Sequence, residues 1–284
     1  MSLMKRISIL GARGMLGQDL MSAGNRTGLE VRGYDLPEID VTDATHGLDA
    51  LETCDAIINC AAYTDVDGAE TDFDAAMKVN CAGAANVAEW CRKNSVQLIH
   101  LSTDYIFDGS SRRPYREDDP ANPVNKYGES KLAGEKTVSS ICDKYIIVRT
   151  QSLFGHHGKN FVGTIVNLCR NSGKPLRVVN DQVSAPTYTP HLAEGILRLL
   201  NSKGHGIIHV SAAGSTTWHD FARAIALSVA PETRILKTTT EEYGAMARRP
   251  SYSILDNSRY NKWTGHRLPG WQEGLKDYMQ KEGF

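Results

Sequence analysis

The sequence predicts an α/β protein in which helices cover both faces of a parallel sheet, followed by a smaller lobe. Short apolar segments alternate with helix-like segments through the first half of the chain, which is the pattern of β-α-β units. A glycine-rich turn follows the first apolar segment directly and opens a helix-like segment. After about residue 150 this alternation becomes irregular. The three observations predict a Rossmann-type doubly wound parallel sheet with a smaller C-terminal substrate lobe.

In the first half, the predicted strands are short and apolar, and the predicted helices lie between them. Strands are expected at residues 6–10, 29–34, 56–62, 97–103 and 144–149, and helices at 16–23, 72–91 and 127–139. The segment 104–122 is polar and contains several Pro and Gly residues, so it is expected to be a loop.

The second half predicts helices at 160–171, 190–200 and 217–229, with short strands at 176–179 and 206–210. We therefore place a dinucleotide-binding domain at residues 1–152, with returns to its sheet near 190–211. Residues 153–284 would form most of the substrate-binding lobe. A cleft between the two parts would hold the substrate.

The composition is that of an ordinary globular protein, and it disfavours several classes of function. The chain has 284 residues, of which 41% are apolar and 23% are charged, and its formal net charge is −1. This balance gives no electrostatic footprint for nucleic acid or an anionic membrane surface. No apolar run approaches the roughly 18 residues that a spanning helix needs. The six cysteines include no Cys-x-x-Cys pair, which favours reduced thiols in a cytoplasmic protein.

The glycine-rich turn contains Gly11, Gly14 and Gly17. Glycines let the backbone turn tightly and approach a diphosphate, whose charge the N–H groups of the following helix can bind. The spacing is G-x-x-G-x-x-G rather than G-x-G-x-x-G. A glycine-rich turn without a ligand therefore stays open as an alternative.

An acidic residue, Asp35, follows the second predicted strand. It lies about 20 residues beyond the glycine turn, where a carboxylate suits a ribose 2′-hydroxyl. Asp40 and Val41 come soon after and could flank an adenine. Arg13 instead favours a cofactor with a 2′-phosphate, since a cation beside the glycine turn could bind that phosphate. Small residues after the third strand, such as Ala61 and Ala62, would let a cofactor lie close to the backbone.

Tyr127 and Lys131 are four residues apart in a predicted helix, so their side chains share one face. An ammonium beside a phenol stabilises the phenolate and lowers the pKa of the phenol, which makes the two residues a candidate proton-transfer pair. This spacing also occurs by chance, so an ordinary surface helix stays open on these residues alone. Thr103, taken alone, equally suits an ordinary β-branched strand residue.

Together the motifs resemble a known family. The glycine turn, Asn59-Cys-Ala-Ala62, Ser102-Thr-Asp-Tyr105 and Tyr127-x-x-x-Lys131 are similar to the extended short-chain dehydrogenase/reductases. The resemblance narrows to the dTDP-4-dehydrorhamnose reductases through Ala61-Ala-Tyr-Thr-Asp-Val-Asp67, Ser102-Thr-Asp-Tyr-Ile-Phe-Asp-Gly109, Asn180-Asp-Gln-Val-Ser-Ala-Pro-Thr187 and Ala247-Arg-Arg-Pro250. It spans nearly the whole chain. It implies reduction of the 4-keto group of dTDP-4-dehydro-L-rhamnose to dTDP-L-rhamnose with NADPH or NADH.

The resemblance also implies a role for each matching residue. Tyr127 would be the proton donor, Lys131 would tune it and hold the nicotinamide ribose, and Thr103 would assist at the carbonyl oxygen. The residues that would contact the nucleotide-sugar are Thr103, Asp104, Tyr105 and Ser152. The residues that would bind the cofactor are Gly11, Arg13, Gly14, Met15, Leu16, Gly17, Asp35, Asp40, Val41, Ala61, Ala62, Tyr63, Thr64, Tyr127 and Lys131.

Two departures from the family pattern concern the sugar and a metal. Many members have a Trp against the sugar where this chain has Ser152, so the exact sugar stays open. Some members bind Mg²⁺ through glutamates at a dimer interface, and the matching positions here are Asp19 and Pro190, so we predict no metal site. The expected partner is a nucleotide-sugar, with no nucleic acid and no membrane, and homodimerisation stays open.

Two alternative functions remain. One is a different sugar-nucleotide enzyme on the same scaffold, either a 4-epimerase or a 4,6-dehydratase. Dehydratases commonly add an acid–base pair beside the hydroxyl residue, whereas here Asp104 follows Thr103 and no Glu follows Asp104. The other is a non-catalytic dinucleotide-binding subunit resembling the regulatory partner of methionine adenosyltransferase, which the intact Thr103, Tyr127 and Lys131 disfavour.

Overall fold

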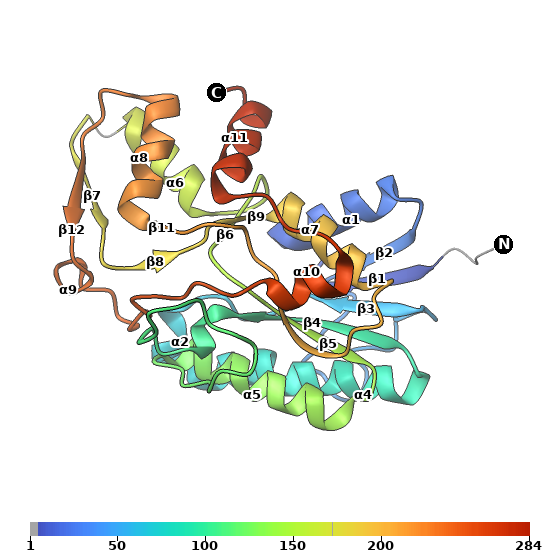
Figure 1. Ribbon diagram of the computed structural model, residues 1–284. Helices are drawn as coiled ribbons and strands as arrows, with labels where there is room; N and C mark the ends of the chain where they lie inside the picture. The colour runs from blue at the N-terminus through green and yellow to red at the C-terminus, as the bar shows by residue number, and fades with distance from the viewer. Residues whose placement is uncertain (1–4, 172) are drawn as a thin grey trace.

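A computed structural model describes residues 5–171 and 173–284. Its centre is a six-stranded sheet in which each strand runs parallel to its neighbours (Figure 1). In spatial order the strands are β10 (Gly206–His209), β5 (Tyr145–Thr150), β4 (Gln97–Thr103), β3 (Ala56–Asn59), β1 (Arg6–Leu10) and β2 (Glu30–Tyr34). The predicted α/β fold class is confirmed.

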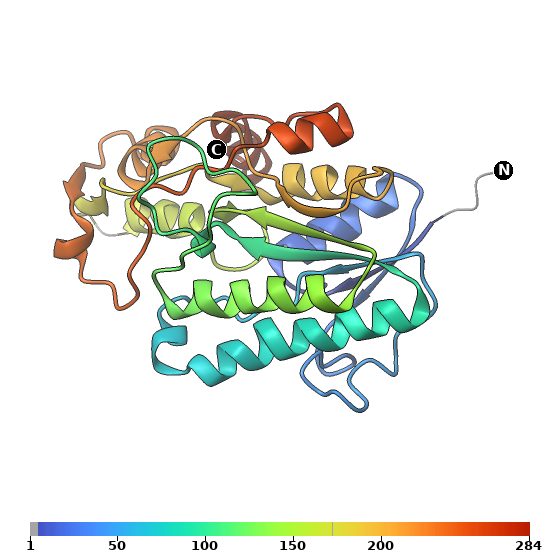
Figure 2. The ribbon, with the colours of Figure 1, turned by 60° about the horizontal axis from the view of Figure 1, so that its bottom comes forward.

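Helices cover both faces of this sheet. On one face α1 (Met15–Arg26) packs against α7 (Thr189–Leu199), and on the other α4 (Ala84–Asn94) packs against α5 (Lys126–Ile141) (Figures 1 and 2). Each face has its own apolar core, and Ile58 and Ile57 on successive positions of β3 contribute to opposite cores. Burial on both faces explains why these strands are almost continuously apolar.

The helix predicted at 72–91 differs from the structure in its centre. It consists of α3 (Phe73–Met77), a π-helical turn η1 (Lys78–Gly83) and α4, so the predicted single helix is wrong in this detail. A π-helical turn inserts an extra residue into the helical repeat and often marks a functional site. Here the turn presents Asn80 to the segment that follows β3, as described below.

The C-terminal lobe is built from short strand pairs and helices around a separate apolar core. Its strand pairs are β7 (Leu176–Val179) with β12 (Ile235–Thr238), β8 (Val183–Ser184) with β11 (Thr216–Thr217), and β6 (Leu153–Phe154) with β9 (Thr187–Tyr188). The other helices of the second half are α6 (Phe161–Asn171), α8 (Trp218–Val229), α9 (Thr240–Tyr243), α10 (Ser258–Thr264) and α11 (Trp271–Glu282). Two short helices of the first half, α2 (Gly68–Thr71) and η2 (Asp104–Ile106), complete the described elements.

Part of the second half of the chain returns to the main sheet, since β10 extends it beside β5 and α7 packs on α1. The division at residues 152 and 153 stays a prediction. Within the described ranges, no helix has both the length and the apolar composition that a membrane crossing requires. All six cysteines are unpaired thiols.

Candidate active site

The glycine-rich turn between β1 and α1 forms a cradle that side chains would fill. Gly11 adopts a φ of 76°, and a Cβ there would lie 2.8 Å from the backbone nitrogen of Ala61. A Cβ on Gly17 would collide with the carbonyl oxygen of Gly11. Gly14 is the N-cap of α1, so the helix has no side-chain cap, and its first turn has no acidic residue. Its N–H groups and dipole are therefore available to an anion, which fits a dinucleotide diphosphate.

Asp35 holds the glycine turn in place. Its carboxylate accepts hydrogen bonds from the backbone N–H groups of Arg13 at 2.8 Å and Leu36 at 2.9 Å. The Arg13 guanidinium donates to the carbonyl of Leu36, the residue after Asp35, at 2.9 Å. Asp40 accepts from the backbone and the hydroxyl of Thr42. A ribose placed here would meet a carboxylate and a guanidinium together.

The segment after β3 is fixed by two asparagines. The Asn59 side-chain oxygen accepts from the Ala61 N–H at 3.1 Å. Asn80, on the π-helical turn, exchanges hydrogen bonds with the backbone of Tyr63 at 2.9 and 3.0 Å, and it donates to the Ser130 hydroxyl at 2.9 Å. Asn80 therefore ties this segment to α5. The sequence analysis missed Asn80, because no spacing signal distinguishes it from a polar residue on an ordinary helix.

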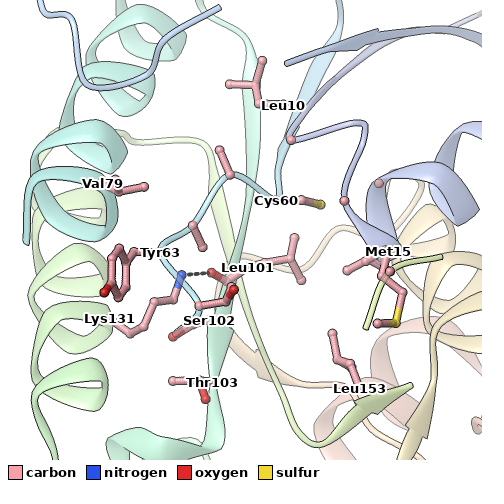
Figure 3. Close-up of a pocket in the computed structure, with 18 of the residues that line it drawn as sticks. Leu10, Met15, Cys60, Tyr63, Val79, Leu101, Ser102, Thr103, Lys131 and Leu153 are labelled. Carbon is pink, nitrogen blue, oxygen red and sulfur yellow. Dashed lines mark hydrogen bonds between the residues drawn. The ribbon is translucent and has the colours of Figure 1, made fainter. Parts of the chain in front are cut away.

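Lys131 is buried and reaches from α5 to the end of β4. Its ammonium donates to the Leu101 carbonyl at 2.6 Å, the bond drawn in Figure 3. An ammonium has three N–H donors, so two remain for a ligand in the cavity. Burial lowers the pKa of Lys131 to about 8, although Glu135 partly opposes the effect.

The phenol of Tyr127 is held neutral, contrary to the sequence expectation. Desolvation raises the pKa of Tyr127 to about 12, the Thr103 hydroxyl partly offsets that rise, and Asp104 adds to it. The expectation that Lys131 lowers the pKa of the phenol is thus wrong, and the Lys131 ammonium is directed at the Leu101 carbonyl instead. A phenol that keeps its proton at neutral pH remains suited to proton donation.

Asp104 is buried beside Thr103 at the same end of β4. The Thr103 hydroxyl lies 3.2 Å from Asp104 Oδ1, and Oδ2 has no hydrogen-bond partner among the described residues. Desolvation raises the pKa of Asp104 to about 7, which hydrogen bonds to Ser253 and Thr103 only partly counteract. At neutral pH this carboxyl group is therefore close to the midpoint of its titration.

We expect Asp104→Asn to stabilise the protein at pH 8 and to stabilise it clearly less at pH 5. The folded chain binds a proton that the unfolded chain has released, so the stabilisation present below the unfolded pKa is lost as pH rises through about 7. The amide removes that penalty, which for a shift of this size is about 2–4 kcal/mol. Thermal melts of both proteins at the two pH values test this, and an equal difference at both would contradict it.

Ser152 adopts the left-handed backbone conformation, with a φ of 49°. A non-glycine residue keeps this conformation where its surroundings hold it, often at a binding site. Here the carbonyl of Ser152 accepts the N–H of Thr187 at 3.0 Å, which ties the end of β5 to β9. The turn places Ser152 at the wall of the cavity.

A single cavity of about 1100 Å³ brings together every residue that the sequence analysis selected. Figure 3 shows its two walls, with Tyr63, Val79 and Lys131 on one side and Met15 and Leu153 on the other. His157, Lys159 and Trp218 also line it, and the sequence analysis missed these three. They belong to the C-terminal lobe, where no motif distinguished them. The residue roles implied by the resemblance stay predictions.

No group of three or more metal-ligating side chains suited to a metal ion occurs in residues 5–171 and 173–284. At one of the positions matched to the family's metal, Asp19 is buried, and the His157 imidazole lies 3.9 Å from its carboxylate. That the activity does not need Mg²⁺ stays a prediction.

The fold and the cavity define a dinucleotide-binding member of the extended short-chain dehydrogenase/reductases. The chain belongs to the family described as RmlD substrate binding domain, which it matches over residues 4–283. It is 38% identical over 281 residues to the spore coat polysaccharide biosynthesis protein SpsK of Bacillus subtilis, covering 98% of each chain. It is 38% identical over 278 residues to dTDP-4-dehydrorhamnose reductase of Streptomyces griseus, covering 95% of this chain and 91% of the other.

A solved structure supports the same membership. The dTDP-4-dehydrorhamnose reductase of Bacillus anthracis, in complex with NADP, superimposes with a TM-score of 0.93 at 36% identity. The match covers 98% of this chain and 100% of that chain.

Proposed function

We propose that this chain reduces the 4-keto group of dTDP-4-dehydro-L-rhamnose to dTDP-L-rhamnose, with NADPH or NADH as the hydride donor. The main support for this proposal is the single cavity that joins the glycine cradle to Thr103, Tyr127 and Lys131. Its relatives named dTDP-4-dehydrorhamnose reductase support the choice of substrate. The unpaired thiols suit the cytoplasmic location that we include in the proposal, and homodimerisation stays open.

The proposed mechanism divides the work between the cofactor and three side chains. When bound, the reduced nicotinamide supplies the hydride to the keto carbon. Tyr127 would give its proton to the oxygen on which negative charge develops. Thr103 would donate a hydrogen bond to the same oxygen. Lys131 would hold the nicotinamide ribose with its free N–H donors and supply positive charge beside the reacting oxygen.

The direct test adds dTDP-4-dehydrorhamnose to the protein and follows the absorbance of NADPH or NADH. We expect oxidation of the cofactor in proportion to the substrate added. A dTDP-sugar without a keto group is the control and should leave the absorbance unchanged. If the substrate caused oxidation of neither NADPH nor NADH, the result would contradict the proposal.

We expect use of both cofactors with modest discrimination. Asp35 should repel a 2′-phosphate, and Arg13, which lines the same cavity, should partly offset that repulsion. The ratio of kcat/KM for NADPH and NADH in one buffer checks this. A preference beyond about a hundredfold, or ~2.7 kcal/mol, would show that one of the two residues dominates.

Replacing Thr103 by valine should lower kcat about 10–10³-fold, as for the loss of one donor to an oxyanion. Valine keeps the β-branched shape at the end of β4 and loses only the hydroxyl. Steady-state kinetics test this, with NADPH affinity as the control. An unchanged kcat would remove Thr103 from the mechanism.

A further inference from the structure

Two motifs that carry the family resemblance meet across the lobes, although neither has a part in the mechanism above. Asp67 precedes α2, and Arg249 lies on the segment after α9, which descends beside α2 in both views (Figures 1 and 2). The Arg249 guanidinium donates a hydrogen bond from each terminal nitrogen to the Asp67 carboxylate, at 3.2 and 2.9 Å. The Ala247 N–H donates to the same carboxylate at 2.8 Å. These bonds, Arg249 foremost, hold the pKa of Asp67 below its usual value.

The segment 247–251, which we call the strap, also contacts the start of α5. The Arg248 carbonyl accepts a hydrogen bond from the Asn125 side chain at 2.8 Å. The oxygen of the same Asn125 side chain accepts the Gly128 N–H at 2.7 Å and so caps the helix that carries Tyr127 and Lys131. The strap thereby contacts the residue that fixes the first turn of α5.

A second route leads from the strap to Tyr127 through Tyr105. The Arg249 guanidinium lies near the phenol of Tyr105, and its positive charge partly opposes the desolvation that raises the pKa of Tyr105. The Tyr105 ring stands edge-on to the ring of Tyr127, with centroids 5.9 Å apart and an angle of 82°. Beyond Tyr105 the strap lies directly on Gly109, where an added Cβ would come within 2.6 Å of the Ser251 nitrogen. The strap and the loop after β4 therefore pack closely against each other at Gly109.

We propose that Arg249, anchored by Asp67, is a positioning residue for the reaction: it holds the strap against Asn125 and Tyr105 and thereby sets the place of Tyr127. The inference rests on the proposed function for its kinetic test. A surface ion pair without this role contributes about 0–1 kcal/mol to stability and leaves turnover unchanged. The two hypotheses therefore predict different results for the same substitutions.

The kinetic test compares Arg249→Gln and Asp67→Asn with a matched control. Arg113→Gln breaks another two-pronged pair, in which Arg113 holds Asp119 at 2.9 and 2.8 Å, and no strap residue takes part in it. We expect both strap variants to lower kcat/KM for the nucleotide-sugar about 10–10²-fold, as misplacement of a reacting group does. NADPH affinity should stay within about twofold of wild type, because neither residue lines the cavity. Arg249→Lys should restore part of the loss, since it keeps the charge without the fork.

A second readout needs no substrate. Hydrogen exchange of the backbone amides of residues 126–131 should be faster in Arg249→Gln than in the wild-type and Arg113→Gln proteins. If the wild-type protein fails to turn over the sugar, the proposed function fails and the exchange measurement still decides the role of the strap. Wild-type exchange in Arg249→Gln overturns the inference, as does wild-type kcat/KM in a protein that turns over, even if the melting temperature falls.

Discussion

Replacing Tyr127 by phenylalanine should lower kcat about 10²–10⁴-fold, the usual contribution of general-acid catalysis. The substitution removes one hydroxyl and leaves the ring, so its edge-on contact with Tyr105 is retained. The cap on α5 depends on Asn125 and Gly128, which the substitution does not touch. NADPH affinity, measured by fluorescence titration, should therefore change little while turnover is nearly abolished.

Tyr145→Phe is the matched control for this substitution. Tyr145 begins β5 at the opposite end of the sheet from the cavity, where its ring packs on His205 at 4.5 Å. Loss of its hydroxyl should leave kcat unchanged. A folded Tyr127→Phe protein that binds NADPH and still turns over at nearly the wild-type rate would rule out Tyr127 as the proton donor.

The sequence predicted the sheet well because its signals are local and strong. β1, β4 and β5 are short, largely apolar segments, which predict buried strands, and the glycine turn marks the connection from β1 to α1. The cavity residues were predictable for a related reason, since they follow the carboxyl ends of parallel strands, which meet at one edge. The comparisons confirm the family that the motifs indicated.

The features that the sequence did not predict depend on contacts between distant segments. Asn80 gains its place from a π-helical turn, which has no strong sequence signature. Arg249 and Asp67 are 182 positions apart, so nothing local indicates their pairing. The pKa of Tyr127 was mispredicted because helical spacing places Lys131 on the same face without fixing where the ammonium points. Desolvation and hydrogen-bond direction both require the three-dimensional structure.

Replacing Lys131 by methionine should impair both turnover and cofactor binding, in contrast to the Tyr127 variant. We expect kcat to fall about 10²–10³-fold, because the positive charge beside the reacting oxygen is lost. NADPH affinity should fall about 10–10²-fold, the scale of hydrogen bonds from a charged group. Steady-state kinetics and a direct NADPH titration on the same preparation separate the two effects.

The fold should tolerate this change, which makes the kinetic result interpretable. Burial lowers the pKa of Lys131 to about 8, so at pH 7 the folded chain carries a charge in a site that disfavours it. That penalty is relieved only as pH rises from about 8 towards the ordinary lysine value of 10.5, and methionine, of similar length and without charge, removes it at pH 7. The melting temperature of Lys131→Met at pH 7 should therefore equal or exceed that of the wild type.

Lys126→Met is the control on the same helix, because Lys126 is paired with Glu129 at 2.8 Å and does not line the cavity. If both variants kept wild-type kcat and NADPH affinity, Lys131 would be an ordinary buried lysine; a loss confined to Lys131→Met, in a protein at least as stable as wild type, assigns the charge to the reaction.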